Sequence, residues 1–148
     1  MEDQDLIIAE IVIKYNISES TVEKLRNFLS KVENFKYLYL MTETTKKGKK
    51  KRKRKTKATN GEIYLPPKEY IKTKYQAEIF SVIERGKLHK LHYHRLIATN
   101  TQIDYKEMQR RFGKYYYLHF EILNLDIETI RKVLQYMFKQ KERNAKDK

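Results

Sequence analysis

Two strand-like segments separated by a short turn place the strongest constraint on the fold. Residues 76–85 and 91–99 are rich in β-branched and aromatic side chains, and the turn between them contains Gly86. The pattern predicts an antiparallel hairpin. Because His92 and His94 are two residues apart on the returning strand, both imidazoles should project from the same face.

The periodicity of the rest of the chain predicts an α+β fold, an antiparallel sheet with flanking helices. Further strands are expected at residues 35–44 and 114–123, and helices within 5–33 and at 68–74, 104–112 and 126–143. Runs of strands with interspersed helices favour a sheet covered by helices. We divide the chain into an N-terminal helical hairpin (residues 1–33), a second domain (34–143) and a flexible tail (144–148). The second domain contains a basic loop at residues 46–58.

A single segment accounts for most of the positive charge. The chain carries 33 basic and 19 acidic residues, for a net charge of +14, and ten of the basic residues lie within 46–57. Their mutual repulsion predicts a solvated loop. A polyanionic partner explains such a run best, so we expect DNA backbone contacts from Lys49, Lys50, Lys51, Arg52, Lys53 and Arg54. The alternative is a solvated loop or an address signal that touches no DNA.

Composition excludes several classes of protein. The chain has no cysteine, so disulfides and thiolate metal sites are excluded. No stretch approaches the roughly 18 apolar residues of a membrane span, so no membrane partner is expected. The acidic N-terminus is not that of a secretory signal peptide. We expect a cytoplasmic protein.

The paired histidines predict a metal site. The hairpin brings Glu84 opposite the histidine end of the returning strand, so His92, His94 and Glu84 form the expected ligand set. Two imidazoles and a carboxylate suit a divalent ion, which we expect to be Mg²⁺ or Mn²⁺. His119 and Glu121 are the rivals for the third position. Histidines on a strand surface without a metal are the simpler alternative.

The last helix carries a candidate nucleophile. Tyr136 lies well away from the centre of the apolar stripe of this helix, and Lys132, Lys139 and Arg143 fall on its side. Tyrosine ionises near pH 10 in water, so a phenolate is scarce at neutral pH, and nearby cations favour it. They would also hold a phosphate, so Lys132 and Arg143 are further expected DNA contacts. The alternative is an amphipathic tyrosine on a basic surface.

The N-terminal hairpin has two interpretations. Residues 16–22 resemble the turn and second helix of a helix-turn-helix, with Ser20 and Glu23 as a capping box. However, Glu19 and Glu23 would repel phosphate at the start of the reading helix. A packing hairpin is therefore favoured over DNA reading. Asp126 is the expected N-cap of the last helix.

Three motifs follow one another in the order found in a known family. They are a hydrophobic strand, a His-x-His strand and a helix with Tyr-x-x-Lys, here at residues 37–42, 92–94 and 136–139. The series resembles the HUH endonucleases, specifically the single-tyrosine rolling-circle replication initiators (Rep proteins). Glu84 before the turn resembles the metal-binding glutamate of parvovirus-type members. The resemblance implies a ferredoxin- or RRM-like sheet, although the first strand lacks the family's threonine-rich signature.

The resemblance also implies an activity. Tyr136 and Lys139 would be catalytic: the tyrosine attacks a phosphate of single-stranded DNA, leaving a 5′-phosphotyrosyl link and a free 3′-hydroxyl. Such nicking and joining would initiate rolling-circle replication of a virus or plasmid inside a prokaryotic host cell. The expected partners are a single-stranded DNA origin, a helicase and polymerase of the host or replicon, and a second copy of the chain in a homodimer.

Two other functions fit the same residues. Single-tyrosine insertion-sequence transposases also use a His-x-His strand, and their tyrosine is often followed by glutamine at the position of Gln140. A metal-free nucleic-acid-binding or transcription-regulating module could instead stack bases on Tyr115 and Tyr117.

Overall fold

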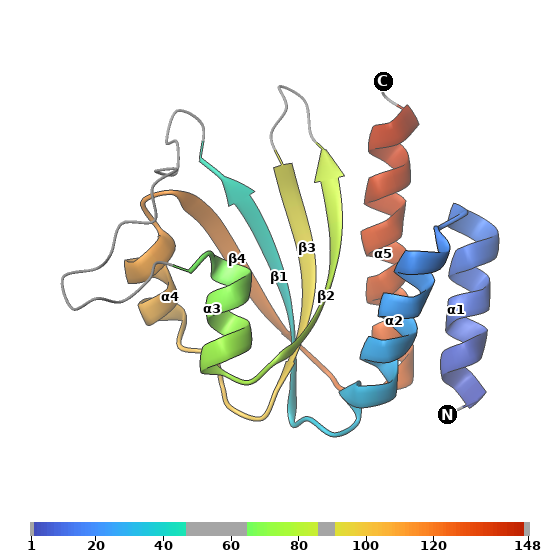
Figure 1. Ribbon diagram of the computed structural model, residues 1–148, viewed down its shortest axis with the longest axis horizontal. Helices are drawn as coiled ribbons and strands as arrows, with labels where there is room; N and C mark the ends of the chain where they lie inside the picture. Colours follow the sequence, from blue (N-terminus) through green and yellow to red (C-terminus); the bar gives the residue numbers. More distant parts are fainter. Residues whose placement is uncertain (1, 47–64, 86–90, 147–148) are drawn as a thin grey trace.

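The chain forms an α+β fold around one antiparallel sheet (Figure 1). The computed structural model describes residues 2–46, 65–85 and 91–146. Within these ranges the sheet has four strands in the order β2-β3-β1-β4. The predicted fold class is confirmed. The elements in chain order are α1 (Glu2–Tyr15), α2 (Glu19–Val32), β1 (Tyr37–Thr45), α3 (Pro67–Lys74), β2 (Glu78–Arg85), β3 (Leu91–Thr99), α4 (Tyr105–Phe112), β4 (Tyr116–Leu123) and α5 (Ile127–Lys146).

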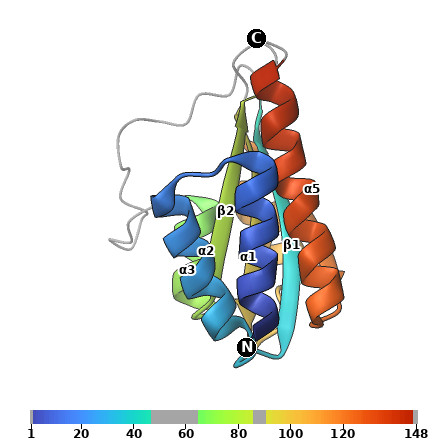
Figure 2. The same cartoon turned by 90° about the vertical axis from the view of Figure 1, so that its right-hand side faces the viewer.

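Helices cover both faces of the sheet (Figures 1 and 2). Helices α1, α2 and α5 lie on one face, where Leu40 of β1 and Phe80 of β2 join Leu134 and Phe138 of α5 in a buried cluster. Helices α3 and α4 lie on the other face, over a second cluster that includes Tyr39. The alternation of side chains along β1 separates the two clusters, because successive residues point to opposite faces.

The N-terminal hairpin packs into the same core as the sheet. Ile11 and Leu25 are almost fully buried and belong to the cluster beneath α5. An exposed bridge also joins α1 to α5, where Arg131 Nε donates to Glu10 Oε2 over 3.0 Å. The amphipathic pattern of the hairpin therefore serves packing, as expected of an αα-hairpin.

Side-chain caps set the starts of two helices. Asp126 Oδ1 accepts from the backbone N–H of Thr129 over 2.8 Å, so the predicted cap of α5 is confirmed. The predicted capping box at Ser20 is wrong, because α2 begins at Glu19 and its N-cap is Ser18. Ser18 Oγ accepts from the N–H of Thr21. The helix starts two residues earlier than the Ser-x-x-Glu spacing indicated.

The strand register determines which side chains meet. Glu84 of β2 pairs with His92 of β3, and Val82 pairs with His94, so the predicted hairpin is confirmed. On the other side of β3, Thr44 of β1 pairs with His92. These residues share one face of the sheet, the face that carries α5.

A hydrogen-bonded carboxylate ties α3 to α4 on the opposite face. Tyr70 donates to Glu107 Oε2 over 2.9 Å, and Lys74 donates to the same carboxylate. The hydrogen bond from Lys74 is the main reason that the pKa of Glu107 lies below its ordinary value of 4.5. Ionised Glu107 therefore stabilises the folded state above pH 4.5, and this stabilisation is lost as the pH falls through the folded-state pKa.

We predict that Glu107→Gln lowers the free energy of unfolding by about 1 kcal/mol at pH 7, because it removes the carboxylate charge that pairs with Lys74. The effect is modest because this ion pair is partly exposed. The difference from the unaltered protein should shrink as the pH falls below 4.5 and through the folded-state pKa of Glu107, because the native carboxyl then becomes protonated. Urea denaturation across this range measures it. Glu23→Gln, at an exposed position of α2, is the control and should change stability by less than about 0.5 kcal/mol at any pH. An effect of Glu107→Gln that does not depend on pH would contradict the assignment.

Candidate functional site

One end of the α5-bearing sheet face is polar. Near the other end this face is apolar and buried, with Leu96 and Ala98 of β3 in the core. Toward the β2–β3 turn the same face carries hydroxyl, imidazole and carboxylate groups. They are Thr42 and Thr44 of β1, Glu84 of β2, and His92 and His94 of β3. The core therefore ends where the candidate site begins.

Glu84 and His94 form a close pair at the centre of the site. His94 Nε2 and Glu84 Oε2 are 2.7 Å apart, and the two side chains are 5% and 17% exposed. The other ring nitrogen of His94, Nδ1, is buried without a hydrogen-bond partner among the described residues. A buried polar atom without a partner is costly and is often found at functional sites.

Thr44 orients His92. Its Oγ1 lies 3.0 Å from Nδ1 of His92, on the neighbouring strand. This contact leaves Nε2 as the imidazole nitrogen that is available to a ligand, which is the arrangement that second-shell hydrogen bonds create in metal sites. Sequence reasoning missed Thr44, because the contact depends on the pairing of β1 with β3.

Tyr136 reaches the site from α5. Its ring packs edge-on against His94, with ring centroids 5.6 Å apart and an interplanar angle of 84°. The side chain is 47% exposed, whereas the neighbouring Met137 and Phe138 are buried. The structure therefore brings the expected nucleophile beside the expected metal ligands, with its phenol at the edge of the site.

The rival ligands lie farther away on β4. His119 pairs with Thr42 and Glu121 pairs with Leu40, so β1 separates both from the histidines of β3. Two strand spacings amount to about 10 Å. His119 and Glu121 are exposed on the open part of the face, where they can contact a substrate more readily than share an ion with His94.

An exposed aromatic side chain marks the same open area. Tyr117 is 62% exposed, and Lys46 Nζ lies 4.8 Å from the centroid of its ring. Tyr115, which was expected to stack on bases together with Tyr117, does not lie in this open area. Tyr115 precedes β4 and packs against the cluster beneath α3 and α4.

The cationic side chains predicted to bind DNA are only partly described. Lys132 and Lys139 are exposed on α5. Arg143 and Gln140 both lie in α5, but the structure does not describe their side chains. Lys49, Lys50, Lys51, Arg52, Lys53 and Arg54 lie outside the described residues altogether.

The predicted three-ligand metal site is not formed as such. Within residues 2–46, 65–85 and 91–146, no three histidine or carboxylate side chains lie close enough to hold an ion. Glu84 and His94 nevertheless have the right chemistry and nearly the right spacing. Adjacent ligands of an octahedral Mg²⁺ at 2.0–2.1 Å lie about 3 Å apart, close to the 2.7 Å between Nε2 and Oε2.

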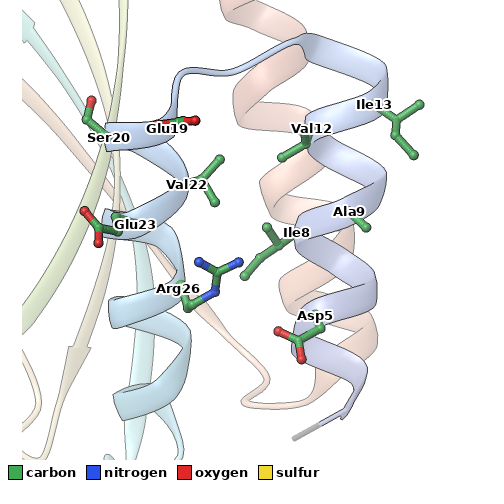
Figure 3. A pocket seen from close by; sticks show the side chains of 10 residues that line it. All are labelled: Asp5, Ile8, Ala9, Val12, Ile13, Glu19, Ser20, Val22, Glu23 and Arg26. Atoms are coloured by element: carbon green, nitrogen blue, oxygen red, sulfur yellow. The ribbon is translucent and has the colours of Figure 1, made fainter.

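The groove between α1 and α2 lies apart from this site (Figure 3). Ile8 and Val12 of α1 face Val22 of α2 across it. Acidic side chains at its rim, including Glu19 and Glu23, oppose binding of a phosphate backbone. The groove shares no residue with the site and argues against DNA reading by this hairpin.

Comparison with known proteins identifies the family. A family described as "Virus, 117-like" matches residues 34–140. The chain belongs to this 117-like viral family. The matched range begins after the N-terminal hairpin and ends within α5, so it contains Glu84, His92, His94 and Tyr136.

Two proteins of one archaeal virus are similar to this member of the 117-like family. "Uncharacterized protein 117" of Sulfolobus islandicus rod-shaped virus 1 is 28% identical over 119 residues, which cover 77% of this chain and 96% of that protein. The crystal structure of the hypothetical protein ORF119 from the same virus aligns with a TM-score of 0.53 and 24% identity, covering 79% of this chain and 93% of that one. The latter similarity shows a shared fold.

The family assignment drawn from the sequence motifs is wrong. The motifs resembled HUH replication initiators, but the chain matches the 117-like viral family, and the described residues form no three-ligand metal group. Each motif is short, and a pair of histidines on a strand arises in many unrelated sheets. The function is therefore inferred from the geometry of the site itself.

We predict that Tyr136 can be removed at little cost to stability, unlike its neighbour Phe138. Phe138→Ala should lower the free energy of unfolding by about 3–5 kcal/mol, because the ring is buried against Phe80 and Tyr15. Tyr136→Ala should cost less than about 1 kcal/mol, because half of its side chain is exposed. Chemical denaturation of both variants measures the difference. Equal losses would show that Tyr136 is a core residue.

Proposed function

We propose that the protein cleaves and rejoins single-stranded DNA through a covalent link to Tyr136. The observation that carries the proposal is the packing of the Tyr136 ring against His94, which also pairs with Glu84. A nucleophilic hydroxyl, two imidazoles and a carboxylate at one end of the sheet face are the groups that phosphoryl transfer from a tyrosine requires. The same groups are rarely gathered by packing alone, because burying a polar group costs free energy.

In the proposed reaction the phenol oxygen of Tyr136 attacks a backbone phosphorus atom. The new bond joins this oxygen to phosphorus while the bond from phosphorus to the 3′ oxygen breaks, and the departing oxygen takes up a proton to become a 3′-hydroxyl. The phenol proton passes to water or to a neighbouring base. Lys139, one turn from Tyr136 on α5, contacts the phosphate charge. Attack by a 3′-hydroxyl on the phosphotyrosyl link reverses the reaction and joins strands.

A divalent cation belongs to this proposal. Glu84, His92 and His94 would hold Mg²⁺ or Mn²⁺, with Thr44 fixing the ring of His92. When bound, such an ion polarises the scissile phosphate as a Lewis acid. The close approach of Glu84 Oε2 to His94 Nε2 supports this assignment, because two ligands of one ion must converge in this way.

The open part of the sheet face offers a path for the DNA strand. Across the strands, Thr44 lies between His92 and Tyr117, and Thr42 lies between His94 and His119. Tyr117 is exposed and can stack on a base, while the cation of Lys46 near its ring adds attraction for phosphate. This arrangement supports a single-stranded substrate, since an unstacked base is needed for contact with an aromatic ring.

The viral relatives suggest a biological setting. The similar proteins come from an archaeal virus. We propose that the reaction initiates replication of such a genome at a single-stranded origin inside the host cell, by the nick that starts rolling-circle synthesis. A helicase and polymerase would act as partners. None of the helices in the described part of the chain is long and apolar enough to cross a bilayer.

A metal-free nucleic-acid-binding module is the second candidate. Two observations favour it: the described residues hold no three-ligand group, and Tyr117 is exposed beside a lysine. Such a module would bind single strands without forming a covalent adduct. Covalent capture of DNA therefore separates the two candidates.

We predict that Glu84→Gln weakens Mn²⁺ binding at least about tenfold, because it removes the anionic ligand. Thr44→Val should weaken it about tenfold through the loss of the contact that orients His92. Isothermal titration calorimetry with Mn²⁺ measures both. The matched control is Glu121→Gln, which changes a carboxylate of the same face and should leave the affinity unchanged. A loss in Glu121→Gln with none in Glu84→Gln would move the site to β4.

We predict a covalent adduct between the protein and single-stranded DNA when Mn²⁺ or Mg²⁺ is present. Denaturing gel electrophoresis with a labelled pool of oligonucleotides detects it. Tyr136→Phe keeps the ring but lacks the nucleophile, so it should abolish the adduct. Tyr105→Phe is the control, because Tyr105 is 46% exposed on α4, much like Tyr136 at 47%. An adduct that persists in Tyr136→Phe refutes the nucleophile, and binding without any adduct selects the second candidate.

A further inference from the structure

A lysine-lined groove lies along the outer edge of β2. Helix α2 flanks this edge on one face of the sheet and α3 flanks it on the other (Figures 1 and 2). Residues 78–81 of β2 line the groove between the two helices. We call it the lysine groove, and its charged and polar lining includes Lys24, Lys31, Lys68, Lys72, Glu78 and Ser81.

The groove concentrates positive charge that the fold leaves largely unbalanced. Lys24 and Lys31 lie two turns apart on α2, and Lys68 and Lys72 lie one turn apart on α3. Among the described residues only Lys31 of these four forms an ion pair, with Glu78 at 2.9 Å. Like charges one turn apart on a helix, such as Lys68 and Lys72, repel each other and destabilise the free protein slightly. An anionic ligand offsets this repulsion.

The strand at the base of the groove adds hydrogen-bond donors. Among the described residues β2 pairs only with β3, so its other edge presents backbone N–H groups that no strand occupies. Outward-facing N–H groups beside ammonium groups are the combination that binds phosphate oxygens. Ser81 contributes a hydroxyl at the same edge, although it also accepts from Arg95.

The groove and the candidate site lie on one strand. Ser81 precedes Glu84 by three residues, which is about 10 Å along a strand. Successive phosphates of a DNA strand are spaced about 3.4 Å apart along a duplex axis. A few nucleotides therefore span the distance. A short acidic peptide could match the charge of the groove, but a nucleic acid is the polyanion that would also extend to Tyr136.

We infer that the lysine groove binds the phosphodiester backbone of DNA next to the segment that occupies the candidate site. The inference extends the proposed function, because it gives the flanking nucleic acid a second point of attachment. It does not depend on cleavage, since ammonium and N–H groups bind phosphates whether or not the tyrosine reacts. The bound segment can be a single strand or the duplex beside it, and the chemistry of the contact is the same.

The test compares two triple variants in a Tyr136→Phe background, which removes the proposed chemistry. The groove variant is Lys24→Gln, Lys68→Gln and Lys72→Gln, and it spares Lys31 because of its ion pair. The control variant changes three exposed lysines elsewhere, Lys36→Gln, Lys106→Gln and Lys114→Gln, for the same loss of charge. Thermal unfolding of both variants verifies that they are folded. Fluorescence anisotropy then gives the dissociation constant for DNA at several salt concentrations, with a single-stranded and a duplex oligonucleotide.

The groove variant should bind at least one of these DNAs about tenfold more weakly than the control variant. Its salt dependence should also be shallower, by about two units of the log–log slope for single strands, since each lost phosphate contact removes about 0.7. The DNA form that shows the change is the one that occupies the groove. If both variants bind both DNAs equally, the inference is overturned and an anionic protein segment becomes the better occupant.

The outcome is independent of the proposed reaction. A selective loss of DNA binding in the groove variant supports the lysine groove even if the unaltered protein forms no adduct. Conversely, an adduct at Tyr136 together with equal binding by both triple variants would support the proposed function and reject the groove.

Discussion

The packing of α5 on the sheet determines the geometry of the candidate site. Leu134, Met137 and Phe138 are buried against the sheet, so the helix can neither rotate nor slide without opening the core. This constraint fixes Tyr136 at the edge of the same contact, where its ring meets His94. The position of a polar, half-exposed group is thus set by apolar neighbours that have no chemical role.

Local patterns in the sequence predicted much of this arrangement. The alternation within residues 76–85 and 91–99, together with the short turn, sufficed to place Glu84 opposite His92. The apolar stripe of the last helix sufficed to separate Tyr136 from the core. Both features depend on residues that are near one another in the chain, where spacing alone determines geometry.

Features that depend on distant parts of the chain were not predictable. Thr44 contacts His92 across 48 positions, through a strand pairing that no local pattern reveals. The lysine groove joins α2, β2 and α3 and likewise has no signature in the sequence. Tyr115 was expected to lie in the last strand with Tyr117, but this strand begins at Tyr116, two residues after the predicted start at residue 114. The family was misassigned because short motifs constrain chemistry more than ancestry.

The N-terminal hairpin lies outside the range that matches the family but inside the core of this protein. The matched range begins at residue 34, yet Ile11 and Leu25 fill the core that also holds α5. Deletion of the hairpin would expose apolar side chains of the remaining sheet and of α5 to water. The hairpin and the matched portion of this protein therefore share one core, and its burial depends on both.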